Sequence, residues 1–266
     1  DMAPDVWFDL PAGHDFHVVN DAVLNEMRVN ERGQIEIPGR ALYEVLVLPD
    51  ESRMKESTLR SIASLVEAGA TVIGPRPQMS PGLQGGPEAD HRVQELATKL
   101  WGPIDGRLVT AHAYGKGRML QGKSVVNALR SRKVVRDFEV MDRGSKLEPR
   151  LDYIHRKIDG LDFYFVSNQR NDPASVRVLL RSEKGLRPEI WHPETGAISP
   201  AIFWQRQADG RTSVDLNLAP AESVFVVFRA ETTNTPGYAQ LSHNGKEITS
   251  PDVAQVVVKG GGLRLQ

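Results

Sequence analysis

Short β runs separated by turns fill the stretch from Leu151 to Arg229, and this pattern limits the folds open to that half of the chain. The runs FYFVSN, SVRVLLRS, TSVDLNL and SVFVVFR mix period-2 alternation with fully apolar segments. Turn sequences along the stretch end in glycine at Gly160, Gly196 and Gly210. Closely spaced short strands of this kind are typical of an antiparallel β-sandwich, which we predict over residues 149–230.

The first half of the chain alternates strands with helices instead. Tyr43 to Pro49 is a continuous apolar run, as expected for a parallel strand that is covered on both faces. An amphipathic helix follows, ends at Gly69, and leads into a second strand at Ala70 to Gly74. The apolar stripe of this helix consists of Leu59, Ile62, Ala63 and Val66. The unit predicts an α/β domain over residues 1–148, a small flavodoxin-like or Rossmann-like layer whose first strand lies upstream of the chain.

Shorter patterns complete the expected order of elements. We expect a strand at Phe16 to Asn20, helices at Asp21 to Met27, Ala89 to Leu100 and Ser124 to Arg130, and a strand at Arg107 to Tyr114. After Arg229, a polar linker leads into residues 231–266. We interpret that tail as an extra strand pair or as the start of a truncated third domain.

Composition excludes several classes of protein. Charged residues make up 25% of the 266 residues and the net charge is −1, so we expect a globular chain with no strong attraction to nucleic acid or anionic membranes. No apolar run reaches the ~18 residues that a membrane span needs. Cysteine is absent, which removes disulfides, thiolate metal ligands and cysteine nucleophiles. The N-terminus, DMAPDVWFDLPAGHDF, has no signal-peptide pattern, and we expect the chain to be a piece of a longer protein.

The segment from Gly117 to Ser124 matches the phosphate-binding pattern G-x-x-x-x-G-K-[ST]. In such a loop, backbone amides, the lysine and the hydroxyl surround the phosphates of a nucleotide. The wider context argues against this interpretation. A domain with such a loop needs further parallel strands downstream, one of them ending in an Asp that holds magnesium. Here the downstream half is predicted to be antiparallel β, and the apolar run that ends in Asp, at Asp50, lies upstream. Nucleotide binding is therefore the weakest of our three functional hypotheses.

Other catalytic patterns are missing from the sequence. The strand that ends at Gly74 is followed by PRP, without the nucleophile on a tight elbow that amidotransferase-like or GxSxG hydrolase chemistry requires. The seven histidines show no metal-ligand spacing, so we expect no metal site in this chain. His112 lies on an apolar strand and is interpreted as a structural histidine.

Glycoside hydrolysis requires two carboxylates on either side of the scissile bond. Asp50, Glu51 and Asp90 lie nearest to the expected strand ends and to the Pro/Gly-rich loop, where α/β sites form. Each is more readily explained as a helix cap or a solvated loop charge, so we name no catalytic pair.

Three places could contact a ligand. Arg76 and Ser80 lie in the loop from Pro75 to Leu83, His155 and Arg156 lie at a strand end, and Trp191 and His192 in EIWHPETG could form a surface on which a sugar ring stacks. The alternative for the His155–Arg156 pair is an ion pair at a strand edge. For Trp191 the alternative is a place in the sandwich core.

Several stretches together resemble a known enzyme family. In order, YEVLVLPDESRM, LRSIASLVEAGATVIGPRPQMSPGL, KLWG, HAYGKGRML, LDYIHRK, DFYFVSN, PEIWHPETG and SVFVVFR are similar to the region C-terminal to the catalytic barrel of family 106 glycoside hydrolases, the α-L-rhamnosidases. The resemblance covers Phe16 to Arg229. The α/β half is also similar to glutamine-amidotransferase-like domains and to the trimerisation-type domain of β-galactosidases.

The resemblance implies a parent enzyme that removes α-L-rhamnose from polysaccharides by an inverting, calcium-assisted mechanism with two glutamates. In that family the glutamates and the calcium ligands belong to the barrel, so it assigns no catalytic residue and no cofactor to this chain. It also implies that the barrel of the same parent chain is the main partner, and that the protein is periplasmic or extracellular.

Three hypotheses follow. The leading one is a non-catalytic accessory part of a rhamnosidase-like glycoside hydrolase. The second is an independent carbohydrate-binding β-sandwich protein whose site includes Trp191. The third is nucleotide binding through Gly117 to Ser124.

Overall fold

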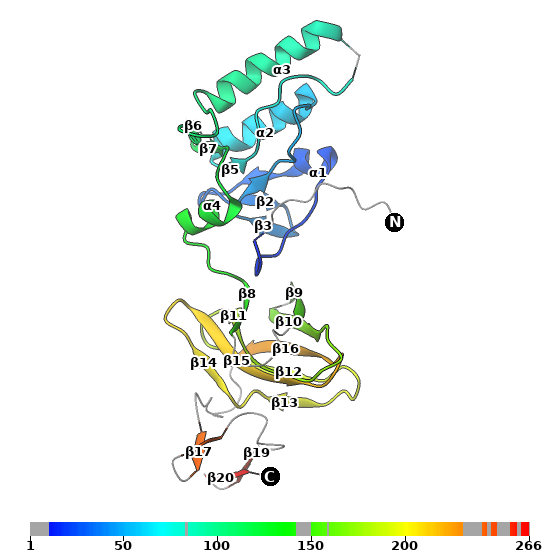
Figure 1. Ribbon diagram of the computed structural model, residues 1–266, viewed down its shortest axis with the longest axis vertical. Helices are drawn as coiled ribbons and strands as arrows, with labels where there is room; N and C mark the ends of the chain where they lie inside the picture. Colours follow the sequence, from blue (N-terminus) through cyan, green and yellow to red (C-terminus); the bar gives the residue numbers. More distant parts are fainter. Residues whose placement is uncertain are drawn as a thin grey trace. The chain divides into compact units, whose positions relative to one another are not determined.

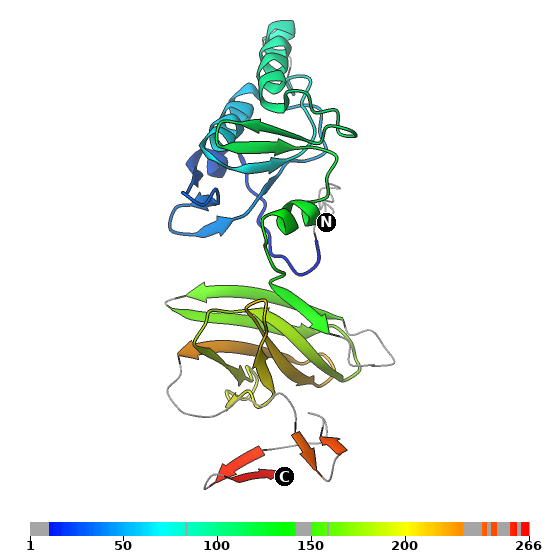
Figure 2. The same cartoon turned by 90° about the vertical axis from the view of Figure 1, so that its left-hand side faces the viewer.

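The computed structural model describes residues 11–82, 85–141, 150–158 and 160–230, together with the backbone of four short strands beyond them. The chain divides into two compact units (Figures 1 and 2). The α/β unit consists of Asp1–Pro11 and Phe16–Val134, and the sandwich unit consists of Ala12–Asp15 and Val135–Gln266. The boundary expected at residues 148/149 lies outside the described residues.

The α/β unit contains four helices and two sheets within its described residues. Its elements are α1 (Asp21–Glu26), β1 (Arg28–Val29), β2 (Ile35–Ile37), β3 (Ala41–Tyr43), β4 (Leu46–Val47), α2 (Glu56–Ala68), β5 (Thr71–Ile73), α3 (Gly86–Trp101), β6 (Ala111–Tyr114), β7 (Gly117–Leu120) and α4 (Val125–Ser131). β1, β2 and β3 form an antiparallel sheet, and the second sheet has the order β4-β5-β7-β6. In the second sheet β4, β5 and β7 are parallel, whereas β6 is antiparallel to β7.

The predicted β-helix-β unit is confirmed as β4, α2 and β5. All four residues of the predicted stripe on α2 are buried, and Gly69 caps the helix with a φ of 131°, which only glycine adopts readily. Val72 and Met119 lie in the same core cluster as residues of α2 and α3, while Ile73 and Leu120 pack with Ala128 of α4. Successive residues of β5 and β7 therefore point to opposite faces of the sheet, and both faces are buried. The assignment of this layer to a flavodoxin-like fold stays a prediction.

Three expected strands differ in the structure, and of the strand expected at Arg107 to Tyr114 only Ala111–Tyr114 forms, as β6. Phe16–Asn20 forms no strand; Val19 packs against the core, while Phe16 and Val18 are 53% and 81% exposed. This segment instead leads to Asn20, whose side chain caps α1. In the apolar run Tyr43 to Pro49 only Leu46–Val47 pairs with β5.

The segment that matches the phosphate-binding pattern does not form a phosphate loop. Gly117–Leu120 is strand β7, paired with β5 and β6, and the Ser124 hydroxyl accepts a hydrogen bond from the backbone N–H of Asn127 at the start of α4. The glycines have packing roles instead. A Cβ at Gly117 would lie 2.3 Å from the carbonyl oxygens of Val66 and Ala70.

The sandwich unit consists of two antiparallel sheets around one core, which confirms the predicted architecture. Its strands are β8 (Phe138–Met141), β9 (Leu151–Ile158), β10 (Leu161–Asn168), β11 (Ala174–Arg181), β12 (Leu186–Trp191), β13 (Ile198–Pro200), β14 (Trp204–Arg206), β15 (Arg211–Leu218) and β16 (Ser223–Ala230). One sheet has the order β13-β12-β16-β10-β9 and the other β14-β15-β11-β8. Side chains of both sheets share the core, among them Val166 and Phe228 of the first and Val178 and Leu216 of the second.

Strand β8 and the segment Ala12–Asp15 join the sandwich although the sequence did not indicate it. β8 pairs with β11, and the backbone N–H of Asp137, just before β8, donates to the Gly13 carbonyl at 2.7 Å. A Cβ at Gly13 would lie 2.2 Å from the carbonyl oxygen of Phe138, so this close approach requires glycine.

Residues 231–266 contain two antiparallel strand pairs. β17 (Leu241–His243) pairs with β18 (Lys246–Ile248), and β19 (Val256–Lys259) pairs with β20 (Gly262–Leu265). Whether they belong to a third domain stays a prediction. Across the described part of the chain, no helix is long and apolar enough to cross a membrane.

The Gly117→Ala variant should lower the free energy of unfolding of the α/β unit by about 3 kcal/mol, because the methyl group would collide with two backbone oxygens that cannot rotate away. Amide hydrogen exchange of β5 and β7 measures this. Arg118→Ala, at the exposed next position of the same strand, is the control and should change stability by less than about 0.5 kcal/mol. A fully stable Gly117→Ala protein, or stabilisation of the unaltered chain by Mg-ATP, would contradict the packing explanation.

Candidate functional site

The most concentrated group of ionisable side chains that we find lies inside the sandwich, around His155. Its Nδ1 is 2.9 Å from Oδ2 of Asp137, and its Nε2 is 2.6 Å from Oδ1 of Asp162. His155 and Asp162 lie on β9 and β10 of one sheet, whereas Asp137 immediately precedes β8 of the other. The three side chains are only 9%, 3% and 4% exposed for His155, Asp162 and Asp137. The histidine therefore links the two sheets through buried, charge-assisted hydrogen bonds.

Tyr164 and Arg181 complete this cluster. The Tyr164 ring stacks on the imidazole with centroids 4.1 Å apart and an interplanar angle of 11°. Its hydroxyl lies 3.0 Å from Oδ1 of Asp137 and 2.8 Å from the carbonyl oxygen of Arg181, either of which can accept its hydrogen bond. The Arg181 guanidinium donates from Nε to Oδ1 of Asp137 at 2.8 Å. We call these five residues the His155 cluster.

The geometry fixes the protonation state of His155. Ionised carboxylates only accept hydrogen bonds, so a carboxylate at each ring nitrogen requires a proton on both nitrogens. Burial by itself lowers the pKa of His155, but the hydrogen bonds that the ring donates to Asp137 and Asp162 outweigh it and hold that pKa above its ordinary value. For Asp137, burial raises the pKa, while the hydrogen bond from His155 and the charge of Arg181 bring it below its ordinary value. The cluster is thus an imidazolium between two carboxylates.

The cluster has little capacity for acid-base catalysis. Burial raises the pKa of Tyr164 far above its ordinary range, and the ring is 0% exposed. A substrate would have to displace Tyr164 or open the sandwich to reach Nδ1 or Nε2 of His155. Lys157, whose Nζ lies 3.4 Å from Oδ2 of Asp162, adds a further charge partner at the same place. The arrangement suits a structural role.

Arg76 and Ser80, predicted as ligand contacts, are engaged within the α/β unit. The Arg76 guanidinium donates to the carbonyl oxygen of Gly102, which caps the C-terminus of α3. The backbone N–H of Ser80 donates to Oδ1 of Asp90 at 2.7 Å. Leu83, at the end of the predicted loop, lies outside the described residues.

The other acidic and histidine candidates of the α/β unit have the structural character expected for them. Asp50 and Glu51 are exposed, and Asp90 fixes the loop backbone at Ser80. The His112 ring packs on Gly102, where a Cβ would lie within 2.5 Å of the ring. In the part of the chain that the structure describes, no three His, Asp or Glu side chains are placed to hold a metal ion.

The four candidates of the sandwich unit are not brought together into one site. His155 is buried, while Arg156 points to solvent and pairs with Asp15 at 3.2 Å. Trp191 is the last residue of β12 and His192 follows it directly. His192 lines the same hollow as Ile190, which packs against the core, so His192 and Trp191 belong to opposite faces. Both are only partly exposed.

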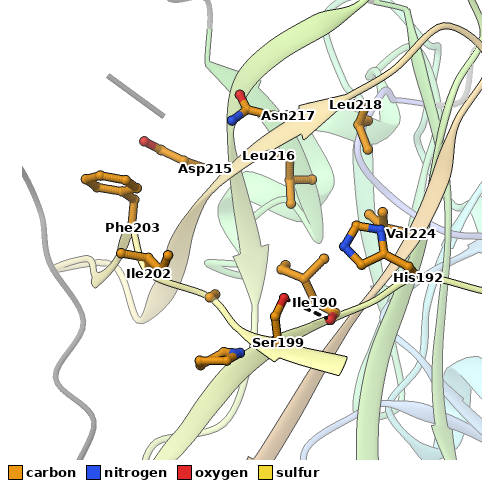
Figure 3. Close-up of a pocket in the computed structure, with 12 residues that line it drawn as sticks. Ile190, His192, Ser199, Ile202, Phe203, Asp215, Leu216, Asn217, Leu218 and Val224 are labelled. Carbon is orange, nitrogen blue, oxygen red and sulfur yellow. Dashed lines mark hydrogen bonds between the residues drawn. The ribbon is translucent and has the colours of Figure 1, made fainter. Parts of the chain in front are cut away.

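His192 lines a shallow hollow of about 170 Å³ at one end of the sandwich (Figure 3). Its walls come from β12, β13, β15 and β16, and Ile190, Leu216, Leu218 and Val224 make them largely apolar. His192 lies 3.4 Å from Glu222. The Asp215 carboxylate at the rim is held by two bonds from Arg177, at 2.6 Å and 3.1 Å. The predicted stacking surface of Trp191 and His192 is therefore divided, and Trp191 lies on the outer face of β12.

The sequence interpretation missed Asp137, Asp162, Tyr164 and Arg181. A signal for two of them was present, because Asp162 alternates with Tyr164 on the inward positions of LDFYFV. A carboxylate at a core position of a strand requires a buried partner. Asp137 carried no such signal, because it precedes residues 149–230, over which the sequence predicts the sandwich.

Comparisons with known proteins agree with the sequence resemblance. Residues 2–205 match the family model of glycoside hydrolase family 106, described as α-L-rhamnosidase. The chain belongs to this family. The rhamnosidase from Novosphingobium sp. PP1Y superimposes with a TM-score of 0.74 at 30% identity, over 89% of this chain and 22% of that one.

A curated relative from Formosa agariphila bears a different activity in its name. That protein, "Putative beta-glucuronidase", is 34% identical over 234 residues, which are 86% of this chain and 18% of the relative. A β-galactosidase from Bacillus circulans sp. alkalophilus matches with a TM-score of only 0.42 at 12% identity, over 71% of this chain and 33% of that one, which is too weak to assign a fold. The family 106 chain thus spans about a fifth of the length of the rhamnosidase and of the Formosa protein.

The stability of the sandwich should fall as the pH rises above neutrality. A histidine whose pKa is raised on folding stabilises fully below its unfolded pKa of ~6.5, and this stabilisation disappears as the pH passes its folded pKa, with a slope of up to ~1.4 kcal/mol per pH unit. Asp137, with a lowered pKa, acts oppositely and loses its contribution in acid. Burial lowers the pKa of His14, and the charges of Arg136 and Arg181 lower it further. Protonation of His14 therefore also lowers the stability of the sandwich in acid.

Urea unfolding of the sandwich unit at pH 6 to 10 measures this dependence. His155→Gln should lower the free energy of unfolding by about 3–5 kcal/mol at pH 6, because it removes the cation that lies between the two buried carboxylates, and should remove the slope above neutrality. The control His192→Gln, in a partly exposed pair, should cost no more than about 1 kcal/mol. An unchanged slope in His155→Gln would show that His155 is not the titrating group.

Proposed function

We propose that this chain is a non-catalytic accessory part of a rhamnosidase-like glycoside hydrolase, which supports the catalytic domain of a longer protein and takes no part in bond cleavage. Membership of the α-L-rhamnosidase family supports the enzyme class. The share of the relatives that the chain spans, 18% and 22%, leaves most of their length for other domains.

The state of the buried carboxylates is the observation that carries the proposal. A glycosidase needs one carboxyl group with a raised pKa as general acid, and both groups must reach the substrate. Asp137 has a lowered pKa, and Asp137 and Asp162 are closed off from solvent on either side of His155. Asp215 is only 2% exposed and is bound by Arg177. These carboxylates stabilise the fold and are unsuited to protonating a leaving group.

The proposal extends to the remaining parts of the chain. The parallel strands β4, β5 and β7, with helices packed on both faces, fit a reduced flavodoxin-like layer that serves as a scaffold. The partner would be the catalytic barrel of the same parent chain, which would also carry the calcium ion, while this chain would need no cofactor. Family membership favours an exported protein, in the periplasm or outside the cell.

The chain alone should release no 4-nitrophenol from 4-nitrophenyl α-L-rhamnopyranoside or from the β-D-glucuronide, the two activities named among its relatives. The Novosphingobium rhamnosidase serves as the positive control for the first substrate. Hydrolysis by the purified chain that a single Asp or Glu substitution abolishes would overturn the accessory role.

A further inference from the structure

The outer face of the five-stranded sheet carries a continuous apolar row. Ile154 lies opposite Phe165, Phe165 opposite Phe225, Phe225 opposite Trp191, and Trp191 opposite Ile198. Residues directly opposite each other share one face of a sheet, so these five side chains cross all five strands in one line. Their neighbours along the strands lie in the core, which places the row on the outside. We call it the outer row.

The outer row is accessible and its aromatic members are held in place. At its two ends Ile154 and Ile198 are 49% and 57% exposed, and the three aromatic residues between them are partly exposed. The Phe165 and Phe225 rings lie 5.0 Å apart. The Trp191 indole donates from Nε1 to Oε2 of Glu189 at 3.0 Å, which fixes its orientation. Apolar patches of this kind, rimmed by polar groups, are typical of binding surfaces.

Polar groups flank the outer row on both sides. On one side, two positions further along the strands, a second line runs parallel to the outer row. In it Asp152, Ser167 and Ser223 lie opposite one another. On the other side Arg156 and Glu189 belong to the next line, which also contains Phe163 and Val227. The face thus offers aromatic rings beside carboxylate, hydroxyl and guanidinium groups. This combination suits a pyranose, whose C–H face packs on rings while its hydroxyls bond to polar neighbours.

We propose that the outer row binds saccharide chains of 6-deoxyhexose, the class to which L-rhamnose belongs; this rests on the proposed function. Both ends of the row are isoleucine, and the row contains no hydroxyl, amide or charged side chain. A methyl group at C6 packs against such a surface without losing a hydrogen bond. A hydroxymethyl group there would lose part of its hydration without gaining a hydrogen-bond partner in the row, which is unfavourable.

Titration of the ¹⁵N-labelled chain with an α-L-rhamnose oligosaccharide, followed by NMR, tests this proposal. We expect shifts at the amides of Phe165, Phe225 and Ile198 and at the Trp191 indole. The matched α-L-mannose oligosaccharide, which differs only by the hydroxyl at C6, should bind about tenfold more weakly. Trp191→Ala should lower the affinity about tenfold, and Ile198→Asn, at an exposed position that does not threaten folding, should reduce the preference for the 6-deoxy sugar.

Gln205→Ala, on exposed β14 of the other sheet, is the control and should bind like the unaltered chain. Absence of binding, equal affinity for the two sugars, or shifts confined to other surfaces would overturn the assignment. A concentration-dependent dimer that Trp191→Ala dissolves would assign the row to a second copy of the chain instead. The accessory role would survive each of these results, because it fails only if the chain alone hydrolyses a glycoside.

Discussion

The sandwich unit depends on one buried interaction, the imidazolium of His155 between Asp137 and Asp162. Two carboxylates at these depths would repel each other and strongly oppose burial without a cation between them. The histidine supplies that charge and donates to both, while Tyr164 stacks on it and Arg181 closes the outer side of Asp137. Because Asp137 immediately precedes β8, the interaction also fixes the point at which the chain enters the four-stranded sheet. The backbone N–H of the same residue donates to the Gly13 carbonyl, so the segment Ala12–Asp15 is held at the same place.

The local parts of the fold could be predicted from the sequence because their signals are local. The stripe on α2, the cap at Gly69 and the strand β5 follow from residues close together in the chain, and the structure has all three. Phe16–Asn20 has the composition of a strand but pairs with no strand in the described structure, and composition cannot show that. The glycines at Gly117 and Gly122 matched a phosphate loop for an unrelated reason: each lies against backbone carbonyls of another segment.

The candidate site shows a similar division. Alternation along β12, continued to His192 directly after the strand, already implies that Trp191 and His192 face opposite ways, so their separation follows from elementary strand geometry. The inward position of Asp162 could likewise have been read from LDFYFV. Asp137 could not, because its meeting with His155 depends on the pairing of β8 with β11 across many residues. Strand alternation places His155 and Asp162 on the inner face of the five-stranded sheet and the outer row on its outer face. One sheet thus carries the structural cluster on one side and the proposed binding surface on the other.

The central claim, that a doubly protonated histidine holds the sandwich together and is closed to chemistry, can be tested at the ring itself. Two-bond ¹H–¹⁵N correlation spectra report whether each imidazole nitrogen carries a proton. At pH 7.5 the account predicts that Nδ1 and Nε2 of His155 are both protonated and that both protons exchange slowly with solvent. A neutral tautomer with one bare nitrogen, or fast exchange at both, would contradict it.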